Sequence, residues 1–72
     1  MNKTEFEYEM KKHGDTQETL AVDMGISRAT LNGKINETSG KEFFTSELKF
    51  IRKKYSLSDA RFIEIFFADY VS

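Results

Sequence analysis

Apolar residues recur three and four positions apart along most of this chain, and residues that commonly begin or end helices bound each run. The pattern predicts five helices, over residues 3–12, 17–24, 28–35, 46–55 and 59–67. The absence of proline and the 14% content of aromatic residues, mostly phenylalanine, favour a compact helical core. We therefore expect one small all-α domain.

The inward-facing apolar side chains of these helices are expected to share one core. Its predicted members are Phe6, Met10, Leu20, Ala21, Ile26, Leu31, Ile35, Leu48, Ile51, Leu57, Phe62, Ile63 and Phe66. The fourth helix presents Leu48, Ile51 and Tyr55 as one buried stripe. Asn2 is expected to cap the first helix, and either Thr45 or Ser46 the fourth.

The most informative stretch is residues 16–36, TQETLAVDMGISRATLNGKIN. Thr16 and Ser27 are each suited to cap a helix, because a side-chain oxygen at that position accepts a hydrogen bond from a free amide of the first turn. Between them, Gly25 stands where a helix ends in a left-handed residue, a conformation that glycine adopts without strain. We expect two short helices joined by a turn of about three residues and crossing steeply.

This stretch resembles the helix-turn-helix of the Cro and cI-type phage repressors, the Xre-like family. The residues that carry the resemblance are Gln17, Ala21, Gly25, Ile26, Ser27 and Leu31, within the specific run T-Q-x-x-L-A-x-x-x-G-I-S. The resemblance extends from Thr4 to about Phe67 and implies a compact five-helix bundle of the phage repressor DNA-binding domain type. It implies one domain over residues 1–72 that binds double-stranded DNA as a sequence-specific transcriptional regulator, a Cro-like repressor of a phage or prophage.

The outward face of the second helix in this stretch carries small or hydrogen-bonding side chains, which suit the edges of bases in a major groove. The residues expected to contact bases are Ser27, Arg28, Ala29, Asn32 and Asn36. Arg28 can bond O6 and N7 of guanine, and Asn32 can bond N6 and N7 of adenine. Alternatively, Arg28 pairs only with a phosphate or a nearby acidic side chain.

Phosphate contacts are expected on both sides of that face. The residues are Thr16, Gln17, Lys34, Thr38, Ser39 and Lys41, with the role of Gln17 implied by the resemblance. Residues 36–44 are predicted to be a loop, and the alternative is an ordinary surface loop without contact to DNA. The chain departs from the family at Lys34, where an inward apolar residue is usual, so that Ile35 would take this role and rotate the outer face.

The overall charge opposes a nucleic-acid partner, since a net charge of −1 and a pI of about 5.8 are not typical of a strong non-specific binder. Its distribution answers part of this objection. Residues 1–25 hold 3 basic and 6 acidic residues (−3), residues 26–54 hold 7 and 3 (+4), and residues 55–72 hold 1 and 3 (−2). The positive segment contains the expected recognition helix, so one basic face is predicted.

The last helix is apolar nearly all round, which favours a twofold homodimer through the carboxy-terminal end. The expected interface residues are Phe66, Phe67, Tyr70 and Val71. Such a dimer would read a pseudo-palindromic operator with half-sites about 34 Å apart. Alternatively, the aromatic residues complete the core of a monomer, and dimers form only on DNA.

Catalytic, cofactor and metal chemistry are not expected. The sequence has no cysteine and a single histidine, His13, and its early glutamates alternate around a helix instead of converging. No small-molecule substrate is implied, and no run of about 18 apolar residues or secretory signal indicates a membrane or export, so a reducing cytoplasm is the expected location. The alternative function is a protein-interaction module on the same fold, such as an antirepressor.

Overall fold

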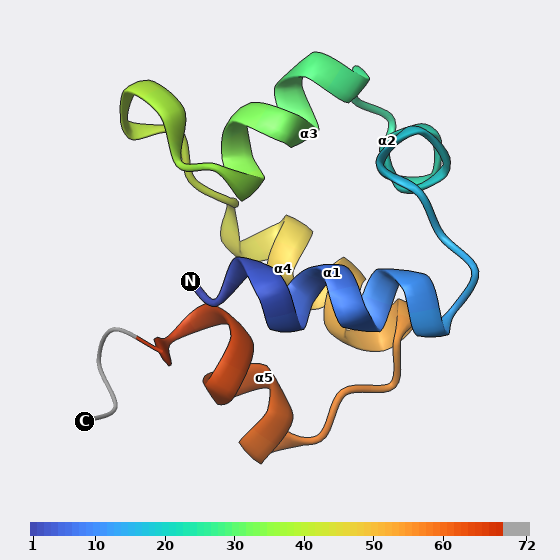
Figure 1. Cartoon of the computed structure of the whole chain (residues 1–72), viewed down its shortest axis with the longest axis vertical. Helices are drawn as coiled ribbons and strands as arrows, with labels where there is room; N and C mark the ends of the chain where they lie inside the picture. The colour runs from blue at the N-terminus through green and yellow to red at the C-terminus, as the bar shows by residue number, and fades with distance from the viewer. Residues whose placement is uncertain (69–72) are drawn as a thin grey trace.

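The computed structural model describes residues 1–68, which form five α-helices and one short 3₁₀ helix without any strand. The elements are α1 (Lys3–Lys12), α2 (Gln17–Met24), α3 (Arg28–Ile35), η1 (Thr38–Gly40), α4 (Thr45–Lys54) and α5 (Asp59–Phe66) (Figure 1). The all-α prediction is confirmed, and each predicted helix end lies within one residue of the observed one.

Polar caps begin four of the five α-helices. Side-chain oxygens of Asn2, Thr16, Ser27 and Ser58 each accept a hydrogen bond from the amide three residues later, at 3.0–3.2 Å. These bonds satisfy amides that the first turn of a helix leaves without partners. The predicted starts of α1, α2, α3 and α5 are therefore explained by local sequence.

The start of α4 differs from its prediction. Thr45 and Ser46 already lie inside the helix, and the residue before it is Phe44, which has no side-chain acceptor. The carboxylate of Glu47 instead accepts a hydrogen bond from the Phe44 amide at 2.8 Å. The predicted cap at Thr45 or Ser46 is wrong because the acidic residue at the third helical position supplies the oxygen.

The core contains most of the predicted side chains. Its buried apolar members are Phe6, Met10, Leu20, Ala21, Leu31, Ile35, Ile51, Tyr55, Leu57, Ile65 and Phe66, with Ile26, Leu48 and Phe62 partly buried against them. The prediction for Ile63 is wrong, because this side chain is 43% exposed, and Ile65, which was not predicted, is fully buried. Residues 62, 65 and 66 share the inward stripe of α5, and Ile63 falls outside it.

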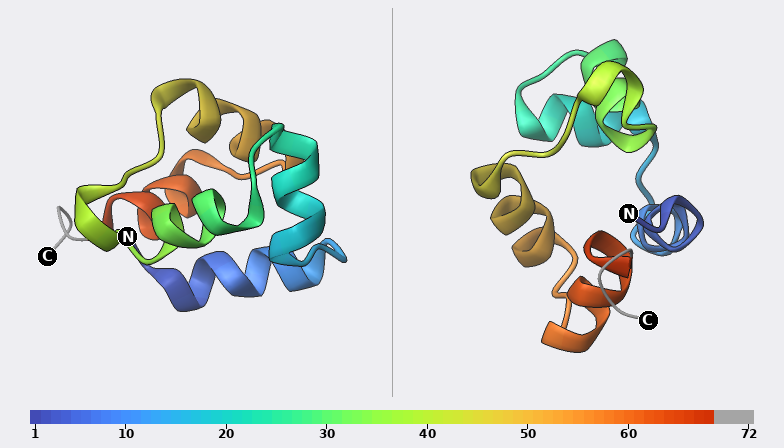
Figure 2. Two further views of the ribbon diagram at one scale, coloured as in Figure 1. Left: turned by 90° about the horizontal axis from the view of Figure 1, so that it is seen from above. Right: turned by 90° about the vertical axis from the view of Figure 1, so that its left-hand side faces the viewer.

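The helices occupy successive levels along the long axis of the molecule, with α2 and α3 at one end and α5 at the other (Figures 1 and 2). α1 and α4 lie between these ends (Figure 2). In Figure 1, α2 is seen end-on while α3 lies across the view, so the two helices cross steeply. The outward side of α3 is therefore turned away from the rest of the molecule.

Candidate nucleic-acid interface

The connection between α2 and α3 is short and closed by backbone hydrogen bonds. Gly25 is left-handed, with φ 72° and ψ 28°, and the next amide, that of Ile26, donates to the carbonyl of Ala21 at 3.0 Å. α3 then begins at Arg28. Ala21 is 2% exposed and Leu31 is fully buried, so a small residue on α2 permits the close approach of an apolar residue on α3.

All five residues expected to contact bases are exposed. At about 100° per residue, Arg28, Ala29, Asn32 and Asn36 lie within an arc of about 100° on the outside of α3. We call these four residues the outward face. Ser27 lies outside this arc and is occupied as the cap, with its hydroxyl also 2.8 Å from Thr30 Oγ1.

Arg28 stands at the first position of α3 and is exposed. No Asp or Glu side chain up to Glu64 forms an ion pair with Arg28 within residues 1–68. The expected alternative of a pairing with a nearby acid is therefore not found in the described part of the chain. Its five donors remain directed to solvent.

Hydrogen bonds link the outward face to the helices on both sides of it. Asn32 Nδ2 donates to Gln17 Oε1 at 3.1 Å, and Asn36 Nδ2 donates to the carbonyl and to Oδ1 of Asn32 at 3.0 and 3.2 Å. The ammonium of Lys3 then donates to Asn36 Oδ1 at 2.6 Å. We call Gln17, Asn32, Asn36 and Lys3 the polar chain. It fixes the side-chain amides of α3 before any ligand is present.

Two residues of the polar chain differ from expectation. Asn36 has its oxygen and its amino group engaged by Lys3 and Asn32, and Asn32 likewise has both groups engaged, by Asn36 and Gln17. Lys3 was not among the candidate residues, and its partner lies 33 positions away in the chain. No local sequence signal could have joined them, because only the packing of α1 beside α3 brings these side chains together.

Lys34 is not a phosphate contact, which corrects the sequence-based prediction. Its side chain is 7% exposed, its ammonium lies 2.6 Å from Glu47 Oε1, and the same nitrogen lies 3.9 Å from the centre of the Phe44 ring. Both Lys34 and Ile35 are thus buried, and the expected rotation of the outer face is not required. The aliphatic stem of Lys34 takes the place of an inward apolar residue, and Glu47 neutralises its charge at the start of α4.

The segment after α3 contains more structure than a plain loop. It includes η1, and Glu37, Ser39 and Gly40 all have positive φ angles, of 54°, 54° and 74°. The candidate phosphate contacts Thr38, Ser39 and Lys41 are all exposed there. Thr16, the other candidate on this list, is exposed at the start of α2.

Two of the four basic residues of α4, which are Lys49, Arg52, Lys53 and Lys54, are neutralised. Arg52 pairs with Asp59, and Lys54 pairs with Asp23 at 2.7 Å and with Asp15 at 3.2 Å. The hydrogen bond to Asp23 raises the pKa of Lys54, and partial burial only weakens this effect. Lys49 and Lys53 are exposed and form no ion pair within residues 1–68.

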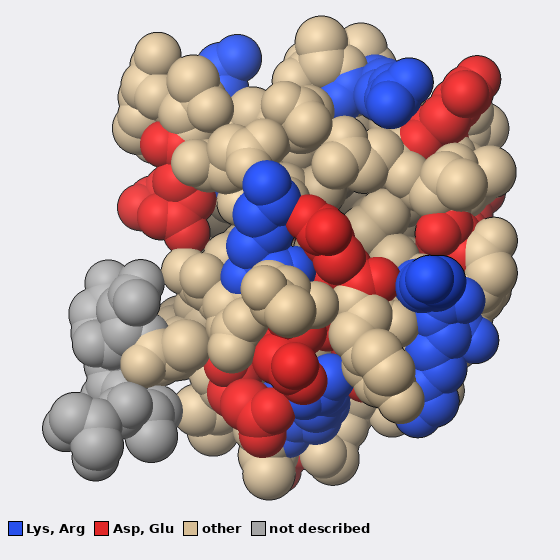
Figure 3. Space-filling view, viewed as in Figure 1, with Lys and Arg blue, Asp and Glu red and all other residues tan. Residues whose placement is uncertain are grey.

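The described surface has no single continuous basic patch on the face drawn in Figure 3. Basic side chains lie apart from one another near the top of this view, in the region of α3 and η1, and further ones are mixed with acidic side chains below (Figure 3). This face therefore does not show the continuous basic surface expected from the sequence.

The expected dimer residues are divided between the core and the surface. Phe66 is 9% exposed and packs against Phe6 with ring centroids 5.6 Å apart, so it belongs to the core of the single chain. Phe67 is 38% exposed. Tyr70 and Val71 lie outside the described residues, so the predicted interface is only partly represented.

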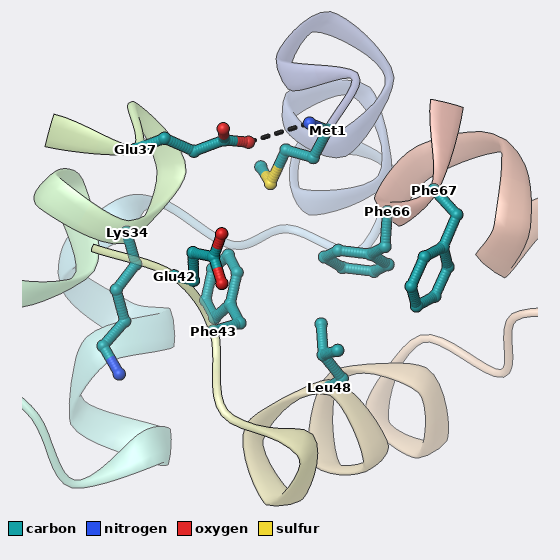
Figure 4. Close-up of a pocket in the computed structure, with 8 residues that line it drawn as sticks. All are labelled: Met1, Lys34, Glu37, Glu42, Phe43, Leu48, Phe66 and Phe67. Atoms are coloured by element: carbon teal, nitrogen blue, oxygen red, sulfur yellow. Dashed lines mark hydrogen bonds and ion pairs between the residues drawn. The ribbon is translucent and has the colours of Figure 1, made fainter. Parts of the chain in front are cut away.

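A hollow of about 160 Å³ lies beside Phe67. Its lining is Met1, Lys34, Glu37, Glu42, Phe43, Leu48, Phe66 and Phe67, and the α-amino group of Met1 lies 2.8 Å from Glu37 at its edge (Figure 4). The ammonium of Lys34 points away from Phe66 and Phe67 (Figure 4). The volume is below the roughly 300–1,000 Å³ typical of small-molecule sites, so this hollow does not favour a substrate.

The early glutamates do converge, contrary to the prediction. Glu5 and Glu9 lie one turn apart on α1, and both bind the guanidinium of Arg61, at 2.6 and 2.9 Å. The bond to Glu5 raises the pKa of Arg61 against a smaller effect of burial. His13 is exposed and stacks on Tyr55, with ring centroids 4.7 Å apart.

Within residues 1–68, no three His, Cys, Asp or Glu residues are grouped as a metal site would require, and no helix is both long and apolar enough to cross a membrane. Comparisons with protein-family models, with curated proteins and with solved structures give no match. The family of the chain is therefore not assigned by similarity, and its function has to be argued from the geometry of α2 and α3.

Proposed function

We propose that this protein is a sequence-specific DNA-binding transcriptional regulator that inserts α3 into the major groove of double-stranded DNA. On this proposal α2 and α3 are a helix-turn-helix within a five-helix domain of the phage repressor type. The observation that carries it is the outward face, where an exposed arginine without an ion pair in residues 1–68 stands beside a fixed carboxamide. Structural surface helices have no need of either feature.

The two central side chains match the edges of different bases. Arg28 is at the amino-terminal end of α3, the end that helix-turn-helix proteins place deepest in the groove, and its fork fits O6 and N7 of guanine. Asn32 gives one N–H to Gln17 and one acceptor position to Asn36. Its second N–H and second oxygen lone pair remain for N7 and N6 of adenine, and the methyl of Ala29 suits a thymine methyl.

Phosphates would be bound on either side of this face. Gln17 lies at the amino-terminal end of α2, where free amides favour an anion, and Thr16 precedes it. Thr38, Ser39 and Lys41 occupy the segment after α3. The geometry adds Lys3, whose ammonium already lies against α3, to this set.

The biological role that fits these contacts is that of a cytoplasmic, Cro-like repressor of a phage or prophage. A small domain with weak non-specific affinity gains selectivity when a homodimer reads two half-sites about 34 Å apart. Phe67 is the described residue that this dimer would use.

The direct test is a titration of the wild-type protein against fragmented phage or host DNA at 50 and 200 mM salt. Each phosphate contact contributes a slope of about −0.9 in log K against log salt, so three to five contacts predict an affinity loss of about 40- to 500-fold over this range. A companion variant is Gln17→Ala, which should weaken binding to all sequences and also reduce the preference at the base pair read by Asn32, because Gln17 holds the Asn32 carboxamide. Binding that is absent, or insensitive to salt, would exclude the proposal.

A second candidate is a protein-interaction module, such as an antirepressor. It is favoured by exposed aromatic side chains that do not belong to α3, namely Phe44 at 67%, Phe50 at 40% and Phe67 at 38% exposure. An apolar protein interface would hold its affinity as salt rises, since salt screens only charge–charge attraction. The salt titration therefore separates the two candidates.

A further inference from the structure

Gly33 and Lys41 are in contact, although one belongs to α3 and the other follows η1. A Cβ atom built on Gly33 would lie 2.9 Å from Cδ of Lys41 and 3.3 Å from its Nζ. Carbon atoms that are not bonded normally keep about 3.5–4.0 Å apart, so a Cβ at position 33 would push the flexible end of the Lys41 side chain aside. The lysine covers Gly33, which is buried for this reason.

The backbone gives no other reason for glycine at this position. Gly33 lies inside α3 and is not among the glycines with positive φ, which are Gly14, Gly25 and Gly40. In a helix interior glycine is less favourable than every residue except proline. The end of the Lys41 side chain is therefore the group that a larger residue at position 33 would displace.

The contact with Gly33 places Lys41 beside the outward face of α3. Gln17 touches α3 at Asn32 and Lys41 touches it at Gly33, and these adjacent residues point about 100° apart around the helix. The two side chains thus approach the outward face from different sides. Lys41 forms no ion pair within residues 1–68, so its charge is available to an anion.

We propose that Gly33 is a positioning residue that seats the stem of Lys41 across α3 and so holds its ammonium for one DNA phosphate beside the groove. This inference rests on the proposed function. Without the seat, Lys41 keeps its charge but loses its fixed place, and the phosphate contact weakens because the side chain has to be ordered on binding.

The experiment measures affinity for the preferred DNA at several salt concentrations for wild type, Lys41→Ala, Gly33→Ala and the double variant. We expect each single variant to lose up to about fivefold in affinity, the range of one exposed charge contact. Lys41→Ala should also reduce the salt slope by about 0.9, and Gly33→Ala by a smaller amount, because Lys41 keeps its charge in that variant. The double variant should be no weaker than Lys41→Ala alone, and Gly33→Ala should unfold at a temperature no lower than wild type, because alanine favours the helix.

The control is Lys53→Ala, which removes an exposed lysine of α4 and should leave the salt slope unchanged. The inference is overturned if Gly33→Ala keeps the wild-type slope. It is also overturned if Gly33→Ala weakens binding further in the Lys41→Ala background, since the added methyl would then meet DNA directly.

A measurement without DNA separates this inference from the proposed function. In the free wild-type protein, nuclear Overhauser effects are expected between the δ protons of Lys41 and the α protons of Gly33. Their absence overturns the seat even if the protein binds DNA. A protein that has the seat and shows no salt-dependent DNA binding instead overturns the proposed function and the phosphate role together.

Discussion

The two ends of the molecule treat the same residue type in opposite ways. Arg61 on α5 is surrounded by the carboxylates of Glu5, Glu9 and Glu64, all within 2.9 Å. Arg28 on α3 is exposed and has no carboxylate within 4.0 Å among residues 1–68. The first arginine joins two helices of the fold, whereas the second has no partner among residues 1–68, and the proposed function assigns this second arginine to a guanine.

The two ends also differ in the kind of side chain that they expose. At the α2–α3 end, the polar chain links exposed side chains from three helices by hydrogen bonds of 2.6–3.2 Å. At the α5 end, Ile63 and Phe67 are 43% and 38% exposed and apolar. The first surface is organised for directed hydrogen bonds, and the second is suited to burial against another apolar surface.

The largest expected effect concerns the buried pair that joins the α2–α3 end to the middle of the molecule, Lys34 on α3 and Glu47 on α4. Glu47→Ala should destabilise the fold by about 4 kcal/mol, because it leaves a buried ammonium without its partner. The measurement is chemical denaturation. The control is Lys34→Met with Glu47→Met, which removes both charges and should be close to wild type in stability. A mild effect of Glu47→Ala would mean that Lys34 reaches water in solution.

The next effect tests the inward stripe of α5. Ile65→Ala should cost about 3 kcal/mol, because Ile65 is fully buried, and Ile63→Ala should cost less than about 1 kcal/mol at its exposed position. Denaturation of both variants under the same conditions measures the difference. Equal losses would show that α5 is rotated from the described position.

A comparison of α2 and α3 with α5 also shows what the sequence could and could not predict. The ends of α2 and α3 were predictable, because Thr16, Gly25 and Ser27 act locally through caps and a left-handed turn. The buried stripe of α5 was only partly predictable: Phe62 and Phe66 were expected in the core, but Ile65 was not, because apolar residues surround this helix. The five candidate base contacts are all exposed as predicted, and no finding yet tests their role.

The candidate phosphate contacts illustrate the same limit. Lys34 was misassigned because charged residues are normally exposed, and its partner Glu47 lies 13 positions away on another helix. Lys3 was missed because it meets Asn36 only after folding. Side-chain pairs between distant helices carry no local signal, so the fold was more predictable than the details of the site.

A smaller effect is expected on the stability of the fold at low pH. It concerns Asp15, at the junction of α1, α2 and α4. Burial would raise the pKa of Asp15, but hydrogen bonds from Tyr55, Thr19 and Lys54 outweigh this and hold it below its ordinary value. A carboxyl group with a lower pKa in the folded state stabilises the fold above its unfolded pKa, near 3.9. This contribution is lost as the pH falls from about 4 through the folded pKa.

The measurement is the free energy of unfolding as a function of pH for wild type and Asp15→Asn. Wild type should lose stability more steeply below about pH 4, and the variant should lack this component. Asp59→Asn is the control, since the side chain of Asp59 is 84% exposed. Parallel profiles for wild type and Asp15→Asn would contradict the assignment to Asp15.

The central claim is that α3 reads base pairs, and selection of binding sites from a random DNA library with wild type and with Arg28→Ala tests it most directly. Wild type should recover a pseudo-palindromic motif that contains a guanine at one position of each half-site. Arg28→Ala should bind this site about 2 kcal/mol more weakly and lose preference at that base pair alone. Recovery of the same motif by both proteins, with the same information at every position, would contradict the claim.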